Sequence, residues 1–445
     1  MSRLSLAAAL LLYATPIVTS AETAECPTVD PHRLTLPAVL ARGLCLDPKV
    51  RQAQAEIRRS DSATGEAASA RAWQLRLQAG PSLNTQQGSG GGVHSASASG
   101  SLVASRTLAD GGLTTARTTQ REREALAAAA DLDAAKQDAL RDLAGAWADA
   151  REAQATLQAA TRALDAARSS DAAARARLAA GTVTRVDALS AASTLAQAER
   201  DVVSAQTAWR RRQGVLAERL GWPADAEIGL GGDESAVIDR LARVIGTGTQ
   251  PAAPNAHPQL AAQRERVQAR RAALDASRAD EGAVVEVSAR TGPSLARGNN
   301  ALPGAWDTTK RWASEVGLTW SMPLSDGGAR RSRTAQSQAS LDAALAQQAA
   351  LDRTLREGLW QQWTAWRASD AELLAARAAL DAAQAAESAQ RGRYEAGAGT
   401  LTDWINAQSD LSARLRQLAG AEQSRLRAAV GTAHAIGRLS LEVAP

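Results

Sequence analysis

The chain has 445 residues, and this length predicts two units rather than a single core. Alanine dominates its apolar residues and phenylalanine is absent, which suits long, closely packed helices better than a compact globule, because alanine favours helices but buries little area. The 51 basic and 47 acidic residues are interspersed and leave a net charge of +4, which argues against nucleic-acid binding, since that needs a concentrated basic patch.

Residues 1–21 have the pattern of a signal peptide. Arg3 supplies the positive start, residues 4–13 form a short apolar run, and Thr19-Ser20-Ala21 offers small residues for cleavage. The apolar run is too short to cross a bilayer as a helix, and no later segment has about 18 uninterrupted apolar residues. We therefore expect an exported protein without a transmembrane helix.

Two cysteines, Cys26 and Cys45, follow the signal peptide. A disulfide and two free thiols both remain open, because the exported compartment permits pairing without requiring it. Thr23-Ala24-Glu25 lacks the small-residue context of a lipoprotein cleavage site, so we do not expect a lipid anchor on Cys26.

The rest of the chain contains two copies of one pattern. Leu108–Gly112 recurs as Leu324–Gly328, and Asp187 matches Asp403 at the same offset. Collinear matches of this kind indicate a duplication. We expect a first repeat over residues 22–221, a connector rich in Gly, Pro and Ala over 222–255, a second repeat over 256–440 and a tail over 441–445.

Each copy opens with a helix after an X-Pro start, over residues 47–72 and 257–279, followed by two alternating segments. One segment alone would favour a half-buried strand of a soluble sheet. Four of them on an exported chain predict membrane-barrel strands with apolar side chains outward, joined by loops over 87–95 and 296–310. The alternating apolar residues are Leu75, Leu77, Ala79, Ala96, Ala98, Leu102, Val285, Val287, Ala289, Val316, Leu318, Trp320 and Met322.

A very long helix is expected next in each copy, over residues 114–178 and 329–394, each spanning roughly 100 Å. Short turns at 181–184 and 397–400 lead to returning helices over 187–220 and 403–439. Such Ala-rich helices with Leu at heptad spacing need neighbours to pack against. Four strands cannot close a barrel, and lipid does not tolerate an open sheet edge, so several chains must share one barrel. Three chains would give twelve strands, but two or four remain open.

At this point the chain resembles the TolC-like outer-membrane efflux protein family. The residues that carry the resemblance are Met322–Gly328, in which Ser325 replaces the family's usual aromatic residue, and Arg393–Gly397 continuing to Leu401–Gln408. The resemblance implies a mixed α/β membrane protein, in which a coiled-coil helical tunnel continues a transmembrane β-barrel with four strands per protomer. It also implies a homotrimer in outer-membrane lipid that docks a periplasmic adaptor backed by an inner-membrane transporter.

The helix turns carry the candidate functional residues. Asp403 falls where the family places an acidic ring at the periplasmic entrance, and Asp187 is its first-copy equivalent. Both also fit a simpler interpretation as helix-start acids that interact with the helix dipole. Asn406 stands where some members have a second acid, and Tyr394 either helps to close the tip or merely packs there. The turn residues expected to meet an adaptor are Gly181, Thr182, Gly397, Gly399 and Thr400.

The sequence argues against an enzyme. Its four histidines are scattered, and neither metal-ligand spacing, a nucleophile elbow nor a phosphate loop is present, so we expect no cofactor and no metal. The favoured function is type I, ABC-exporter-dependent secretion of a polypeptide such as a toxin. One alternative is the outer-membrane duct of a proton-driven pump for small molecules, and a second is a periplasmic coiled-coil adaptor or scaffold.

Overall fold

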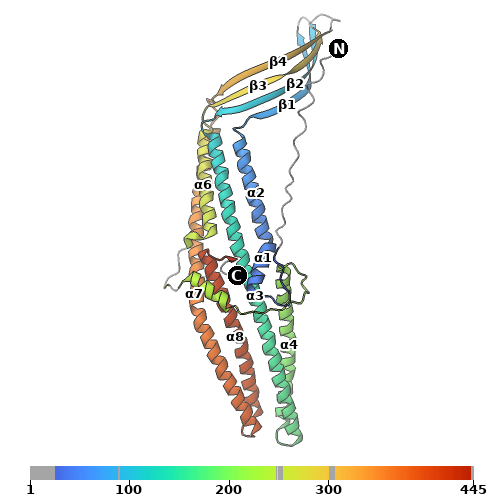
Figure 1. The fold of residues 1–445 in the computed structure, drawn as a ribbon, viewed down its shortest axis with the longest axis vertical. Helices are drawn as coiled ribbons and strands as arrows, with labels where there is room; N and C mark the ends of the chain where they lie inside the picture. Colours follow the sequence, from blue (N-terminus) through green and yellow to red (C-terminus); the bar gives the residue numbers. More distant parts are fainter. Residues whose placement is uncertain (1–25, 89–90, 247, 249–253, 300–305, 442–445) are drawn as a thin grey trace.

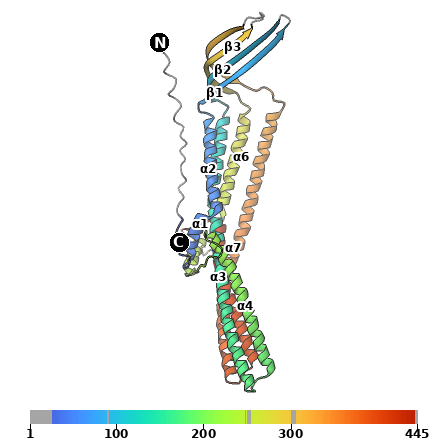
Figure 2. The same cartoon turned by 90° about the vertical axis from the view of Figure 1, so that its right-hand side faces the viewer.

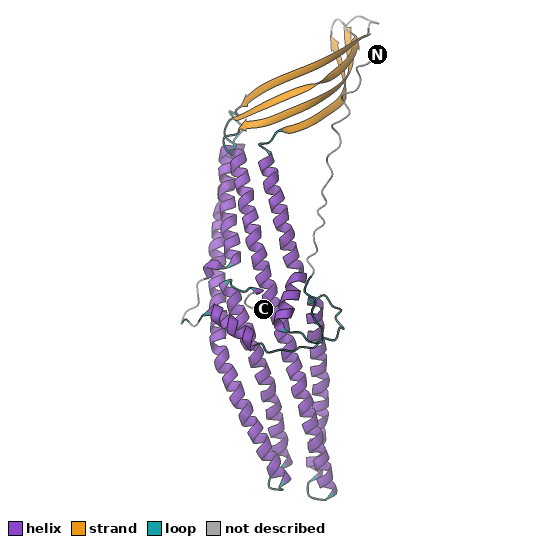
Figure 3. Ribbon diagram, viewed as in Figure 1, coloured by secondary structure: helices purple, strands orange, loops and turns teal. Residues whose placement is uncertain are grey.

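The computed structural model describes residues 26–88, 91–246, 248, 254–299 and 306–441. The expected signal peptide and nearly all of the expected tail lie outside the described residues. The molecule is elongated, with a sheet at one end and two tiers of helices below it (Figures 1 and 3). Among the described residues, no helix combines the length and apolarity needed to cross a bilayer.

The two longest helices, α3 and α7, have 67 residues each and run through both tiers. The expected helices are found with ends shifted by at most a few residues. Two shorter helices, α1 and α5, were not predicted, and α5 lies inside the expected connector. The helices are α1 (Leu36–Leu46), α2 (Pro48–Ser69), α3 (Leu113–Ala179), α4 (Arg185–Arg219), α5 (Ser235–Ile245), α6 (Pro258–Ala279), α7 (Ala329–Glu395) and α8 (Leu401–Ile436).

Four antiparallel strands form one sheet in the order β1-β2-β3-β4. They are β1 (Gln74–Gly88), β2 (Gly91–Ala109), β3 (Val284–Asn299) and β4 (Trp306–Ser321). The bounds expected for the two hairpin loops, 87–95 and 296–310, are therefore wrong. The strands extend into both ranges, because backbone pairing continues to Gly88↔Gly91 and Asn299↔Trp306. Ladder hydrogen bonds come from the backbone, so pairing persists where the apolar alternation has stopped. The β2–β3 ladder joins the two copies into a single sheet.

The duplication organises the helices as well. In the upper tier α3 packs against α2 and α6, and in the lower tier it packs against α4 and α8, while α7 packs against α6 and then α8. The neighbours are thus α2-α3-α6-α7 above (Figure 2) and α4-α3-α8-α7 below (Figure 1). At the tops of α3 and α7, Gly112 and Gly328 adopt left-handed φ angles of 92° and 88°, which suit glycine at these tight turns.

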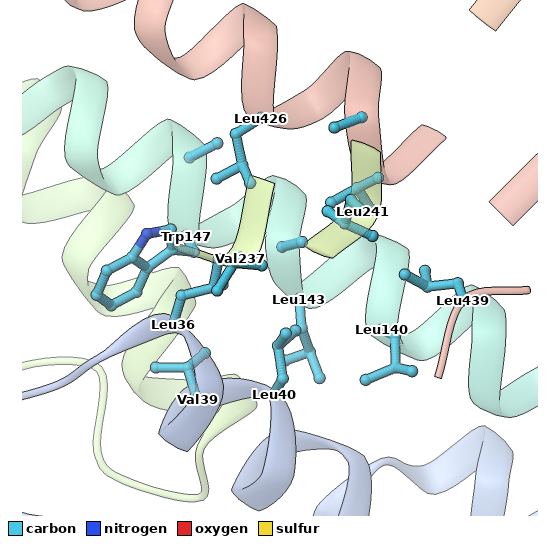
Figure 4. Close-up of a cluster of buried hydrophobic side chains, with 14 of the residues drawn as sticks. Leu36, Val39, Leu40, Leu140, Leu143, Trp147, Val237, Leu241, Leu426 and Leu439 are labelled. Carbon is cyan, nitrogen blue, oxygen red and sulfur yellow. The ribbon is translucent and has the colours of Figure 1, made fainter. Parts of the chain in front are cut away.

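The main hydrophobic core lies where the two tiers meet (Figure 4). Trp147 of α3 is fully buried there, among leucines of α1, α4, α5 and α8. Its indole Nε1 donates a hydrogen bond to Glu234 at the start of α5 (3.1 Å), and Arg151 donates to the same carboxylate oxygen (2.9 Å). The disulfide Cys26–Cys45 fastens the segment before α1 to this region.

Candidate functional site

The register of the sheet places its large apolar side chains on one surface, here called the apolar face. In antiparallel pairs, directly opposed residues point to the same side, and sides alternate along each strand. Leu77 and Val316 of this face are 77% and 79% exposed, so no part of the described chain covers them. The apolar face carries Leu75, Leu77, Leu83, Leu102, Val285, Val287, Leu295, Trp312, Val316, Leu318 and Trp320. An exposed apolar band of this kind is typical of a barrel surface in contact with lipid.

Two hydroxyl groups that fall on the apolar face are hydrogen-bonded to each other. The Oγ1 atom of Thr291 lies 2.8 Å from the Oγ atom of Ser314, and the Nε1–H of Trp312 donates to Thr291 Oγ1 at 3.2 Å. Lipid offers no alternative partners, so internal pairing lowers the cost of placing these groups in an apolar medium.

The opposite surface of the sheet, here called the polar face, lacks large apolar side chains among the described residues. Val103 and Val284 are its only side chains of apolar type larger than alanine in that part of the chain. Its polar members are Gln74, Arg76, Gln78, Ser82, Asn84, Ser95, Ser97, Ser99, Ser101, Ser105, Thr107, Glu286, Ser288, Arg290, Ser294, Thr309, Arg311, Glu315, Thr319 and Ser321. This surface suits contact with water and forms the inner wall when the sheet closes.

The sheet is open at both sides. Within the described chain, β1 pairs only with β2, and β4 pairs only with β3. The outer edges of β1 and β4 therefore carry backbone groups that need partners, and lipid cannot supply them. A single chain therefore cannot close this sheet into a barrel.

The turn between α3 and α4 forms the first helix tip (Figure 2). Gly181 has a φ of 72°, and Thr182 returns a backbone hydrogen bond to Arg177 O at 2.9 Å. Thr184 and Asp187 form a reciprocal capping box at the start of α4. Asp187 Oδ2 accepts from both the backbone N and the hydroxyl of Thr184, at 3.0 and 2.7 Å. Asp187 therefore takes part in the cap at the start of α4, where a helix-start acid was expected, and its role at an entrance ring stays a prediction.

The turn between α7 and α8 forms the second tip. Gly397 has a φ of 75°, and a Cβ on Gly399 would lie 3.1 Å from Arg393 Cβ, so both positions favour glycine. Thr400 accepts a hydrogen bond from Asp403 N at 3.1 Å. Asp403 and Asn406 are both exposed near the start of α8. A ring of three Asp403 carboxylates stays a prediction, because it requires three chains.

Tyr394 packs in a small cluster that joins the two tips. It is 3% exposed, and its ring stacks on Trp404 with centroids 5.2 Å apart. From the other hairpin, the Arg177 guanidinium lies 4.0 Å from the centroid of the Tyr394 ring and donates to Tyr394 O at 2.7 Å. The Trp404 indole donates to Glu387 at 2.9 Å. The sequence offered Tyr394 as a candidate, but the contributions of Arg177 and Trp404 were missed.

A cluster of polar side chains, His257, His434 and Asp138, lies at the junction of α8 and α6, beside the main core. His257 caps α6, accepting from Gln259 N at its Nδ1 atom, and its ring meets that of His434 edge-on at 5.7 Å. Burial lowers the pKa of His257 to about 4; nearby His434 acts in the same direction and Asp138 opposes it. Asp138 has a lowered pKa chiefly because it hydrogen-bonds His434 (2.7 Å). His257 and His434 line a cavity of about 400 Å³ between α3, α7 and α8.

Comparisons with known proteins agree with this architecture. Residues 39–221 and 251–438 match the family described as "Outer membrane efflux protein". Protein CyaE of Bordetella pertussis is 29% identical over 436 residues, covering 93% of this chain and 86% of that protein.

Solved structures of low sequence identity share the fold. The outer membrane protein VceC of Vibrio cholerae is 18% identical with a TM-score of 0.73, covering 90% of this chain and 96% of its own. The open MtrE outer membrane channel of Neisseria gonorrhoeae is 18% identical with a TM-score of 0.74, covering 90% and 88%. The expected fold class, a helical tunnel joined to a shared β-barrel, is thereby confirmed, as is the expected location in the outer membrane with helices in the periplasm. Since the family match spans most of both copies, this chain belongs to the outer membrane efflux protein family.

Proposed function

We propose that three copies of this chain form one channel that receives cargo from a periplasmic adaptor and an inner-membrane transporter and releases it outside the cell. The observation that carries this proposal is the open four-stranded sheet with one apolar and one polar face. Three such sheets would supply twelve strands, an even number within the bacterial range, and would leave no free edge.

The helix tips provide the surface for the adaptor. A Cβ atom added at Gly181 or Gly397 would meet no other atom within 4 Å, so the backbone of both turns is open to a partner. Thr182, Gly399 and Thr400 complete the two turns. The energy for export would come from the transporter, and this chain would act as a duct without enzymatic activity.

For the cargo, we propose a polypeptide such as a toxin, delivered by an ABC exporter in type I secretion. Two observations support this choice over a proton-driven pump for small molecules. Cys26 is held in a disulfide, so its thiol is not available for a lipid anchor, and the polar face presents no aromatic ring on its described side chains for stacking drug-like molecules. The scaffold alternative does not account for the exposed apolar face.

The channel is tested in two steps. Outer-membrane fractions should contain a heat-modifiable trimer, and the purified protein should conduct ions across a planar bilayer. A monomeric, non-conducting protein would disprove the channel. Deletion of the gene should then abolish secretion of a protein while drug sensitivity stays unchanged. Lowered drug resistance with an intact set of secreted proteins would favour the efflux pump instead.

A further inference from the structure

A row of charged side chains crosses the polar face at one level of the sheet. Arg76 of β1 pairs with Val103 of β2, Val103 pairs with Arg290 of β3, and Arg290 pairs with Glu315 of β4. All four therefore point to the same side of the sheet. Arg76, Arg290 and Glu315 are exposed.

The rows next to this one on the same face carry no charge. Toward the helices the next row consists of Gln74, Ser105, Ser288 and Gly317, and away from them it consists of Gln78, Ser101, Gly292 and Ala313. The two arginines and the glutamate thus form a band with a net charge of +1 per chain, and the nearest other charges described on this face, Glu286 and Arg311, lie two rows away on either side.

The spacing of the strands gives the geometry of this band. Neighbouring strands lie about 4.8 Å apart, so the Cα atoms of Arg76 and Arg290 are separated by about 10 Å. This distance is close to the Debye length of about 10 Å at 0.1 M salt, so the fields of the two guanidinium groups overlap. Glu315 faces Arg290 directly and offsets part of its charge.

We propose that this row becomes an arginine-rich ring in the lumen of the assembled barrel and makes that section of the channel prefer anions, including acidic stretches of a passing cargo. The inference rests on the proposed trimeric channel, in which three copies contribute six arginines and three glutamates. A ring of one net sign attracts counter-ions and repels co-ions within a narrow passage. Its sign is opposite to that of Asp403 at the periplasmic tips.

The test measures reversal potentials of the full-length protein in planar bilayers under a KCl gradient. In the double variant Arg76→Gln/Arg290→Gln, the chloride-to-potassium permeability ratio should fall at least about twofold. Glu315→Gln should raise the ratio, because it removes the charge that offsets Arg290. Lys310→Gln is the matched control, since Lys310 lies on the apolar face of the same sheet and should leave the ratio unchanged.

Ions also pass the entrance at the helix tips, so the Asp403 carboxylates contribute to the measured permeability ratio. The same comparison is therefore repeated in an Asp403→Asn background, where the contribution of the ring to selectivity is larger. Conductance with an unchanged ratio in the double variant overturns the ring and leaves the channel intact. An equal shift in Lys310→Gln also overturns it. Absence of conductance in the wild type overturns the proposed function and the ring with it. If the double variant fails to form trimers, Arg76→Gln and Arg290→Gln are measured singly.

Discussion

Lowering the pH from 7 to 5 should destabilise each chain through one side chain, His257. This residue is 2% exposed at the junction of α8 and α6, and burial lowers its pKa from the ordinary 6.5 to about 4. The unfolded chain takes up a proton on this imidazole as the pH falls below 6.5, whereas the folded chain takes it up only near 4. Stability is therefore lost as the pH falls through this window and levels off below it.

The two pKa values set the size of the effect. One pKa unit corresponds to about 1.4 kcal/mol, so the loss between pH 7 and pH 5 is about 2 kcal/mol per chain. Asp138 also contributes, but its pKa is lowered, so its stabilisation is lost at a lower pH, as protonation proceeds through its folded pKa. Burial raises the pKa of Glu422 above its ordinary 4.5, so the folded chain protonates this carboxyl first and its contribution opposes that of His257 at the lower end of the range. The loss of stability that begins near pH 6.5 is therefore assigned to His257.

The assay is thermal unfolding of the detergent-solubilised protein, followed by circular dichroism at pH 7, 6 and 5. Asparagine is a good N-cap that does not titrate, so His257→Asn should flatten the pH dependence. The absolute stability of the His257→Asn variant will also differ from that of the wild type. The quantity compared is therefore the slope of melting temperature against pH. His32→Asn is the control, because His32 is exposed. Equal slopes in wild type and His257→Asn would refute the reasoning.

Three further predictions concern the core, the disulfide and the tip. Trp147→Ala should cost about 3 to 5 kcal/mol and lower the melting temperature well below that of Trp360→Ala, because Trp147 is fully buried and Trp360 is 56% exposed. Cys26→Ala should cost about 3 kcal/mol, and added reductant should lower the melting temperature of the wild type but not of the variant. Tyr394→Ala should make residues 396–400 easier to cleave with protease, whereas Tyr394→Phe should not, because the Tyr394 hydroxyl has no hydrogen-bond partner within the described structure and the ring supplies the contacts. Equal cleavage of these two variants would contradict the packing role.

The long helices were predictable because the heptad spacing of their apolar residues is a local pattern that repeats along the chain. Heptad-spaced positions such as Leu143 and Leu164 are buried, as are their counterparts Leu359 and Leu380. Helix α5 had a helical pattern too, with Val237, Ile238, Leu241 and Ile245 buried, but it is short and lies in a segment whose Gly and Pro content indicated a linker.

The missed features depend on contacts between distant segments. The strand ends are fixed by backbone pairing, which polar and glycine residues support as well as apolar ones. Likewise, Arg177 and Tyr394 are separated by 217 residues, and neither local pattern reveals that they meet. The side chains that join the two tips are placed by packing of one hairpin against the other, so composition and periodicity do not identify them.

The helices at the flanks of the molecule, like the edges of the sheet, are left uncovered within one chain. The matching helices α2 and α6 have 22 residues each, yet α2 buries one residue and α6 buries nine. In the upper tier α2 lies at the flank of the row, while α6 has helices on both sides. In the lower tier the flanking helices also expose large apolar side chains, such as Val203 on α4 and Leu374 on α7. Because the same flanks carry unpaired strand edges above and uncovered apolar helix surface below, the neighbours that pair the strand edges in the proposed trimer would also cover the helix flanks.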